Sequence, residues 1–345
     1  MSSVSKGLTK DEDLLYASTV NKAGAVFPIF DLRKVDLFLL FQNYWKWKRN
    51  IYIKFKISLR NSSGKEIYSS PQKKPSNINK ISVRELCDKK NIPYKSLNSG
   101  TIEIEISSKE NIYFPFPAIM CLYVSKKGHT STVHSAGRNT SKFKKEIFSE
   151  TNFCIVFNEQ FKPFIHLFNG QSGILDNLRV EIVSANNKIS SSIEPLIKPY
   201  ESKIIFLEDI FDIYSEGCQY FLKEKGSSNK KLKLDDDYCI FIRGRCENIF
   251  PRFIVGNFDV INNYPCVTHS FREIVEEDYF SNINNNLSAS TIALPIPSED
   301  IKLKLKIFPT ISPNKTNIDI HIHNLKDLRE IKSYTNINLS TNKGK

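Results

Sequence analysis

The sequence predicts a mostly β protein, built from tandem antiparallel β-sandwich-like modules with an internal repeat and few short helices. Three observations predict this fold class. Apolar and polar residues alternate along many segments, turn-forming residues separate these segments, and a set of landmarks recurs at a nearly constant offset. An α/β enzyme fold is disfavoured, because the strand-like segments do not alternate with helical stretches of about ten or more residues.

Alternation with a period of two identifies the strands, because it places one face of a strand on a core and the other in water. The segments that show it are Ile51–Leu59, Thr101–Ser107, Asn177–Val183, Ile301–Ile307 and Asn317–His323. Turn residues stand between the runs, as at Asn61–Gly64 and Ser125–Gly128. Short helices are expected at Ser82–Lys90 and Leu207–Ser215.

Two parts of the chain carry the same landmarks in the same order. Aligning Pro117 with Pro251 takes an offset of 134 residues; His134 follows the first proline by 17 residues and His269 follows the second by 18. Each copy contains a Phe-Pro turn, an apolar strand, a polar turn and a second strand that ends in His-Ser. The preceding strands and helices also match in pairs: Ile102–Ile106 with Tyr238–Ile242, Val83–Asp88 with Leu207–Asp212, and Ile51–Leu59 with Leu178–Val183. We infer a duplicated module near β-sandwich size.

The repeat divides the chain into five parts. They are an N-terminal extension (residues 1–36), a basic, aromatic β module (37–150), a second module that repeats it (151–281), a partial third module (282–334) and a disordered tail (335–345). The partial third module holds too few strands to bury a core of its own, so we expect it to complete or flank a neighbouring sheet. Nothing in the sequence specifies an oligomeric state.

Cysteine usage and the N-terminus indicate a soluble protein of the cytosol. The N-terminus carries Asp11, Glu12 and Asp13 without an apolar signal region, and no apolar stretch approaches the roughly 20 residues that span a bilayer. The seven cysteines are odd in number and form no C-x2-C pair, which favours reduced core thiols over a disulfide framework. Cys266 is the best placed of them for a nucleophile. We expect no cofactor.

Positive charge is concentrated in about one fifth of the chain. The net charge is +12, and residues 40–100 hold 14 basic residues against three acidic ones. This stretch includes both tryptophans, among basic residues, in the run Tyr44, Trp45, Lys46, Trp47, Lys48 and Arg49. Aromatic rings among cations suit an anionic polymer or a glycan, or single-stranded nucleic acid through base stacking. On a strand Trp45 and Trp47 would share one face; alternatively the tryptophans are core residues and the lysines a solvated face.

Histidines recur at matching positions of the two copies. His134 is followed by Arg138, and His269 by Arg272. A histidine beside a serine and followed by an arginine can bind an anion or a sugar carboxylate. In the alternative interpretation, each is a strand-end histidine whose ring bonds a backbone carbonyl and fixes a turn.

No established catalytic motif is present. The G-x-S-x-G, P-loop and G-x-G-x-x-G patterns do not occur, and no metal ligands are expected beyond the pair His321 and His323, whose shared strand face leaves metal binding open. We therefore expect a non-catalytic binding or scaffold protein with a basic aromatic surface, whose ligand is an anionic polymer or glycan. The alternatives are an enzyme with a His/Arg site between the two modules, and a single-stranded nucleic-acid binder.

Overall fold

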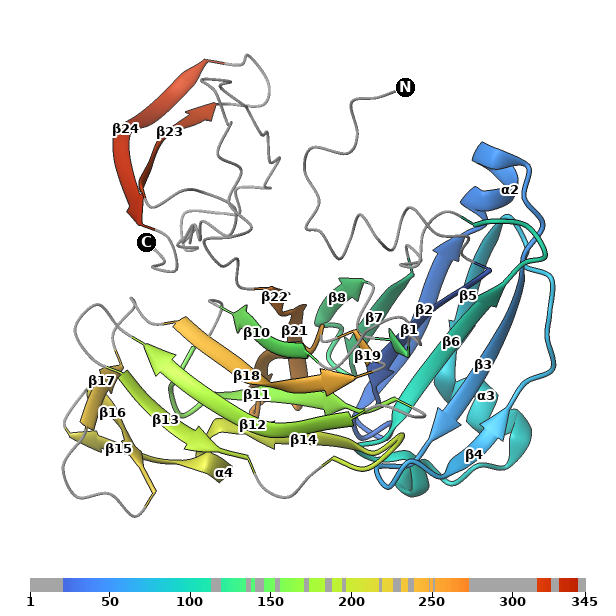
Figure 1. The fold of residues 1–345 in the computed structure, drawn as a ribbon, viewed down its shortest axis with the longest axis horizontal. Helices are drawn as coiled ribbons and strands as arrows, with labels where there is room; N and C mark the ends of the chain where they lie inside the picture. The colour runs from blue at the N-terminus through green and yellow to red at the C-terminus, as the bar shows by residue number, and fades with distance from the viewer. Residues whose placement is uncertain are drawn as a thin grey trace.

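The computed structural model describes residues 21–112, 119–134, 138–139, 146–152, 156–170, 174–183, 188–193, 197–216, 219–225, 231–234, 239–247, 249–250, 252–272, 315–323 and 329–340. These residues form a mostly β fold of antiparallel sheets with few short helices, as expected (Figure 1). No helix among them is both long and apolar enough to cross a membrane.

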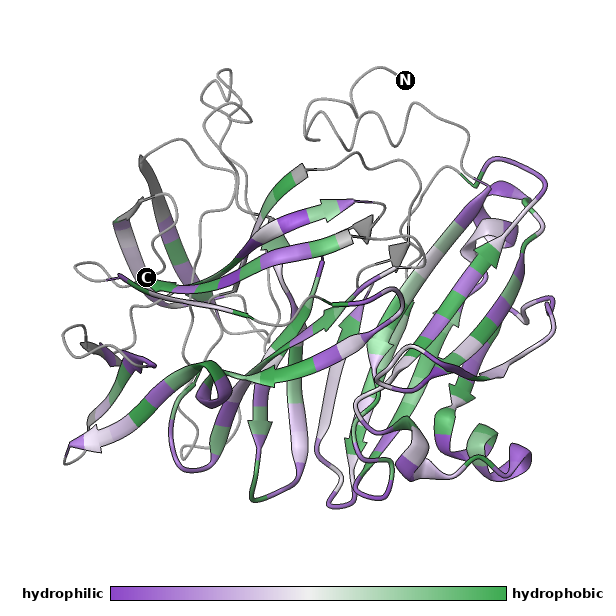
Figure 2. Cartoon of the chain, turned by 60° about the horizontal axis from the view of Figure 1, so that its bottom comes forward, coloured by the Kyte–Doolittle hydropathy of each residue, from purple (hydrophilic) through white to green (hydrophobic). Residues whose placement is uncertain are grey.

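The first module is a sandwich of two four-stranded sheets. One sheet has the order β1 (Lys22–Pro28), β6 (Thr101–Ser107), β3 (Lys54–Arg60) and β4 (Glu66–Ser69). The other has the order β5 (Ile78–Ser82), β2 (Val35–Gln42), β7 (Met120–Ser125) and β8 (Thr130–His134). Residues of alternate parity enter the core, as Phe55, Ile57 and Leu59 do from β3. Figure 2 shows this alternation as green and purple bands along the strands.

The second module is a sandwich of the same kind. One sheet has the order β13 (Lys188–Ser192), β12 (Ile174–Val183), β18 (Cys239–Glu247), β10 (Glu146–Asn152) and β22 (Phe271–Arg272). The other has the order β14 (Ser202–Phe206), β11 (Phe161–Phe168), β20 (Ile254–Asp259) and β21 (Tyr264–His269). Leu167, Val180, Ile242 and Val255 contribute to its separate core.

The remaining elements are short helices, a small sheet and two strand pairs. The helices are α2 (Tyr44–Arg49), α3 (Val83–Lys90), the 3₁₀ turn η2 (Tyr94–Leu97) and α4 (Leu207–Ile210). A three-stranded sheet contains β15 (Phe211–Glu216), β16 (Gln219–Glu224) and β17 (Lys231–Leu234). Two further strand pairs are β9 (Arg138–Asn139) with β19 (Ile249–Phe250), and β23 (Lys315–His323) with β24 (Glu330–Ser340).

The two sandwiches share one topology, which confirms the internal repeat. In chain order, the first, sixth, third and fourth strands of each module form one sheet, and the fifth, second, seventh and eighth form the other. In the first module these strands are β1 to β8. In the second they are β10, β11, β12, β13, β14, β18, β20 and β21. The second module adds β15–β17 between its fifth and sixth strands, and β22 at a sheet edge.

The agreement extends to single residues. In the last hairpin of the first module Met120 pairs with His134, and in that of the second module Ile254 pairs with His269. The turn of the second hairpin is one residue longer than that of the first, which accounts for the one-residue difference in the spacing of the two histidines. The histidines therefore occupy equivalent positions in the two sandwiches.

One sheet of the second module packs with its outer face against the first sandwich, beside the edge strands β1 and β8. The residues of this sheet that join the first core or pack against it are Phe164, Ile204, Phe206, Ile254, Phe258 and Val267. Phe30, in the loop between β1 and β2, stands at the centre. Its ring centroid lies 5.6 Å from that of Tyr123, 5.4 Å from Phe164 and 6.0 Å from Phe258. The first core is thus completed by side chains of the second module.

A second contact between the modules depends on a glycine. Gly64 has φ +85°, and a Cβ atom at this position would lie 2.8 Å from the carbonyl carbon of Tyr200, which no real side chain tolerates. The Arg60 guanidinium lies 3.8 Å from the centroid of the Tyr200 ring. The strand that follows Tyr200, β14, is also held against the first module, because the Ser202 amide donates to the Ser62 carbonyl oxygen at 3.0 Å.

Several sequence-based boundaries require correction. β1 lies within residues 1–36 and pairs along its length with β6, so this segment is part of the first module and not only an extension. Of the helix expected over Leu207–Ser215, four residues form α4 before β15 begins. β24 reaches Ser340, inside the segment expected to be a disordered tail. The expected strand Ile301–Ile307 and the two Phe-Pro turns lie outside the described residues.

Candidate functional site

The aromatic and basic segment forms the short helix α2, at one end of the first module (Figure 1). The Asn43 side chain caps its N-terminus by accepting from the Lys46 amide, and Asn50 ends it in a left-handed conformation. Three basic residues, Lys46, Lys48 and Arg49, lie in its last turn, where positive charge is favoured by the helix dipole.

The expectation that Trp45 and Trp47 share a face is wrong, because it assumed a strand. Residues two apart on a helix are separated by about 200° and point to opposite sides. Trp45 is fully buried in the first core with Tyr44 stacked on it at a centroid distance of 4.0 Å. Trp47, in contrast, is 76% exposed. One tryptophan is therefore a core residue and the other a surface residue.

The α2 surface consists of the exposed residues Trp47, Lys48, Arg49 and Tyr52 together with the half-buried Lys46. Tyr52, just beyond the helix, is 66% exposed. The Lys46 ammonium lies 3.9 Å from the centroid of its ring, and the Lys48 ammonium lies 5.8 Å from that of Trp47. The α2 surface thus combines two exposed aromatic rings with cations of the same segment.

Elsewhere in the first module, part of the basic charge is neutralised. On the outer face of the sheet, Lys56 of β3 stands opposite Glu105 of β6. Arg60 forms ion pairs with Glu103 at 3.7 Å and with Glu66 at 3.3 Å. The charge counted over residues 40–100 leaves out the acids of β6, although this strand is the direct neighbour of β3. The basic excess of the module is therefore smaller on this sheet than at α2.

The two equivalent histidines meet where β8 and β21 lie side by side. The ring centroids of His134 and His269 are 5.0 Å apart, in an edge-to-face arrangement. Between these strands the Val267 amide donates to the Ser131 hydroxyl oxygen at 2.9 Å. Duplication of the module thus brings two residues that are distant in sequence into direct contact.

The surroundings favour the neutral form of both imidazoles. Burial, together with the positive charge of Arg252, lowers the pKa of His134 and lowers that of His269 to about 4. The Nδ1 atom of His269 lies 2.8 Å from the Ser270 carbonyl oxygen, which is the strand-end contact of the alternative interpretation. The pair offers neutral ring nitrogens near a guanidinium, an arrangement compatible with binding an anion.

Ser270 has a structural role beside this pair. Its hydroxyl accepts from the Phe253 amide at 2.9 Å and donates to the buried Glu150 carboxylate. Both bonds are within the second sandwich, so the hydroxyl is not directed at a histidine. Burial raises the pKa of the Cys266 thiol, which disfavours the thiolate that a nucleophile needs.

The structure describes only the backbone of Arg138 and Arg272. Arg138 lies on β9, four residues after His134, and Arg272 stands opposite Glu150 in the pairing of β22 with β10. Each arginine thus lies on a short strand that follows its histidine in the chain, and the role of the two side chains stays a prediction.

Two further histidines lie on the hairpin of β23 and β24. The rings of His321 and His323 face the same side, with centroids 6.3 Å apart, as their spacing predicts. The Nδ1 atom of His321 lies 2.9 Å from a carboxylate oxygen of Glu330, and this contact lowers the pKa of the carboxyl group. Among the described residues, no three His, Cys, Asp or Glu side chains are placed to hold a metal ion together.

Comparison of the chain with protein-family models gave no match, and comparison with curated protein sequences gave none either. Its function is therefore inferred from the geometry of these side chains.

Proposed function

We propose that the protein is a non-catalytic binding protein, and that the α2 surface takes an anionic polymer, most simply an acidic glycan. The observation that carries this proposal is the 76% exposure of Trp47 on a helix whose other exposed residues are basic. Burial of a large exposed indole under a ligand is favourable. The adjacent cations select a ligand with negative charge. The cytosolic location expected from the sequence is part of the same proposal.

The surroundings of α2 favour an extended ligand over a small one. Tyr52 and Lys54 continue the exposed surface along the chain beyond the helix. Phe55 forms a backbone bridge with Lys73, which places the exposed Lys73 and Lys74 next to the start of β3. Cations thus continue from the helix along the edge of the sandwich, where a chain of repeated anionic units could contact several of them at once.

A second candidate function is supported by the contact between His134 and His269. Neutral imidazoles at a junction of two modules could exchange protons with a bound substrate, as the enzyme alternative requires. Because the Nδ1 atom of His269 is already engaged by a backbone carbonyl, His134 is the more available of the two rings. The test of the main proposal therefore includes a variant at this position.

Binding titrations test the proposal. The ligands are a sulfated oligosaccharide, a uronic-acid oligosaccharide, a neutral oligosaccharide and a single-stranded oligothymidylate, each labelled with a fluorophore and measured at low and high salt. We expect Trp47→Ala with Lys48→Ala to weaken binding of the acidic oligosaccharides at least tenfold, about 1.4 kcal/mol, because stacking and a cation contact are both lost. The melting temperature should stay unchanged, since both side chains are exposed.

The matched control removes cations elsewhere on the first module. Lys89→Ala with Lys95→Ala changes two exposed lysines at and after α3, and affinity should fall far less. Equal losses in both variants would show that only net charge matters and would contradict the proposal. Preference for the oligothymidylate would identify a nucleic-acid binder instead, and loss of binding in His134→Ala alone would move the site to the module junction.

A further inference from the structure

The second module carries a pocket beside its short helix α4. At equivalent places, directly after the fifth strand of each module, a short helix begins: α3 in the first module and α4 in the second. In the first module the chain then returns to the sandwich through η2, whereas in the second it forms the additional sheet of β15, β16 and β17 (Figure 1). Residues of this inserted sheet line the pocket together with residues at the start of β11.

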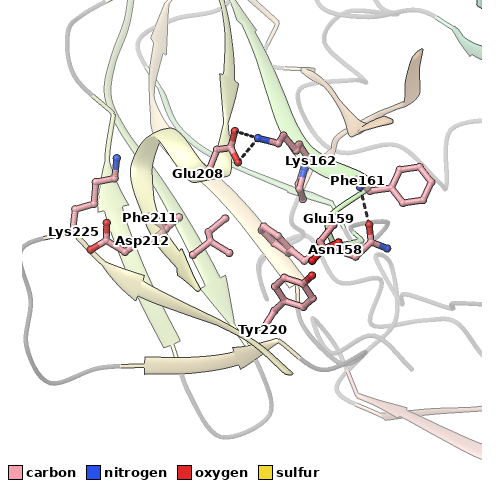
Figure 3. A pocket seen from close by; sticks show the side chains of 12 residues that line it. Asn158, Glu159, Phe161, Lys162, Glu208, Phe211, Asp212, Tyr220 and Lys225 are labelled. Atoms are coloured by element: carbon pink, nitrogen blue, oxygen red, sulfur yellow. Dashed lines mark hydrogen bonds and ion pairs between the residues drawn. The ribbon is translucent and has the colours of Figure 1, made fainter. Parts of the chain in front are cut away.

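The pocket has a volume of about 440 Å³, within the range typical of small-ligand sites. Figure 3 shows side chains from the start of β11, from α4 and from the inserted sheet around it. Its aromatic lining consists of Phe157, Phe161, Phe211 and Tyr220. The Asn158 side chain shapes one rim, because it accepts from the Phe161 amide at 2.7 Å.

Both cations in the lining are already engaged. The Lys162 ammonium lies 2.6 Å and 2.9 Å from the two carboxylate oxygens of Glu208. The Lys225 ammonium donates to the Asp209 carbonyl oxygen at 2.7 Å. A ligand with a negative charge would have to displace one of these contacts, which disfavours an anion.

Two carboxylates of the lining remain without a counter-ion. Glu159 and Asp212 are both exposed at the pocket, and neither has a hydrogen-bond or ion-pair partner in the part of the chain that the structure describes. Lys223 stands opposite Asp212 in the pairing of β15 with β16, yet forms no ion pair with it there. The backbone contact of Lys225 leaves its charge in place, so the lining holds three carboxylates, Glu159, Glu208 and Asp212, against two lysines, and its net charge is negative.

We propose that this pocket binds an organic cation, either an ammonium or a guanidinium group. Such a group would pair its charge with Glu159 or with Asp212, which Figure 3 shows on opposite sides of the pocket, and would lay its carbon chain against the aromatic rings, where Tyr220 provides a cation–π contact. The chain as a whole carries a net charge of +12 and repels cations, so binding of this kind requires a local site. The ligand could be a free amine or a Lys or Arg side chain of a peptide.

Calorimetric titration tests this proposal on the full chain. The ligands are putrescine, the neutral analogue butanediol and a short peptide Gly-Arg-Gly. We expect binding of putrescine or of the peptide, no binding of butanediol, and at least a tenfold loss of affinity in Asp212→Asn with Glu159→Gln. Both residues are exposed, so the variant should fold as the wild type does, which melting curves would verify.

Glu110→Gln is the matched control, because it removes one exposed carboxylate from the first module, and its affinity should equal that of the wild type. Binding of putrescine alone would identify a free amine as the ligand; binding of the peptide alone would identify a side chain of a partner. Failure of both cations to bind would overturn the proposal, as would equal binding of butanediol or full affinity in the double variant. Neither result bears on the α2 surface, which lies in the other module.

Discussion

Phe30→Ala should lower the free energy of unfolding by about 3–5 kcal/mol, which is more than replacement of an aromatic residue at the surface would cost. The ring is 6% exposed and contacts Tyr123 of the first sandwich together with Phe164 and Phe258 of the second. Its removal leaves a cavity at the point where the two modules share a core. Side chains of neither module can fill this cavity while the modules stay docked. Urea unfolding followed by circular dichroism measures the effect.

The matched control for this prediction is Phe38→Ala. Phe38 of β2 holds the position in the first module that Phe164 of β11 holds in the second, as the pairing of each strand with its neighbour shows. Unlike the buried Phe164, Phe38 is only half-buried, and it belongs to neither of the two cores that the described residues form. Its replacement should cost less than about 1.5 kcal/mol, and an equal cost for both variants would show that the interface contributes little.

His166→Leu should stabilise the protein and reduce the pH dependence of its stability. His166 lies on β11, on the face that packs against the first module; it is 2% exposed, and its Nε2 atom has no hydrogen-bond partner among the described residues. Burial lowers its pKa to about 3. Leucine is the natural replacement, because Leu40 occupies the equivalent position of the first module.

The sign follows from proton binding. Unfolded chains bind a proton at His166 below a pH of about 6.5, whereas the folded protein does not until about pH 3, so the free energy of unfolding falls as the pH falls through this range. The change of this pKa from 6.5 to about 3 corresponds to a loss on the order of 5 kcal/mol. The pKa values of Asp31 and Asp259 are lowered in the fold, so protonation of these two carboxylates in acid also lowers the free energy of unfolding. The difference between wild type and variant isolates the histidine.

Urea unfolding at pH 7, 5 and 4 checks this prediction. The advantage of His166→Leu over the wild type should grow as the pH falls, in addition to about 1–3 kcal/mol gained at every pH because an unpaired polar atom leaves the interface. His269, whose pKa is lowered to about 4 by burial, keeps part of the pH dependence in the variant. A difference that is independent of pH would place His166 in contact with solvent.

The repeat was predictable because its evidence is local. Apolar and polar residues alternate along each strand, turns contain Gly or Asn, and a strand-end histidine follows at a set distance. All of these signals can be recognised in a single sequence. The β6 strand Thr101–Ser107 has the expected bounds, and the helix expected over Ser82–Lys90 begins after its capping residue Ser82. Even the one-residue difference between the copies has a single cause, in the turn of the last hairpin.

The candidate sites were harder to predict because they depend on contacts between distant segments. Six residues are too few to separate a helix from a strand, so the exposure of Trp47 and the burial of Trp45 could not be assigned in advance. The contact of His134 with His269 depends on how the modules dock. One signal was present, since the apolar run Pro163–Phe168 is nearly continuous, which is typical of a strand buried on both faces.

The central structural claim is that the second module completes the core of the first, so that both unfold together. The chain has two tryptophans, and Trp47→Phe leaves the buried Trp45 as the single fluorescent reporter in the first module. In that background Leu167→Ala, which alters only the core of the second module, should move the Trp45 unfolding transition to lower urea by the same amount as the circular-dichroism transition. A Trp45 transition that stays in place while circular dichroism shows an earlier step would contradict the account.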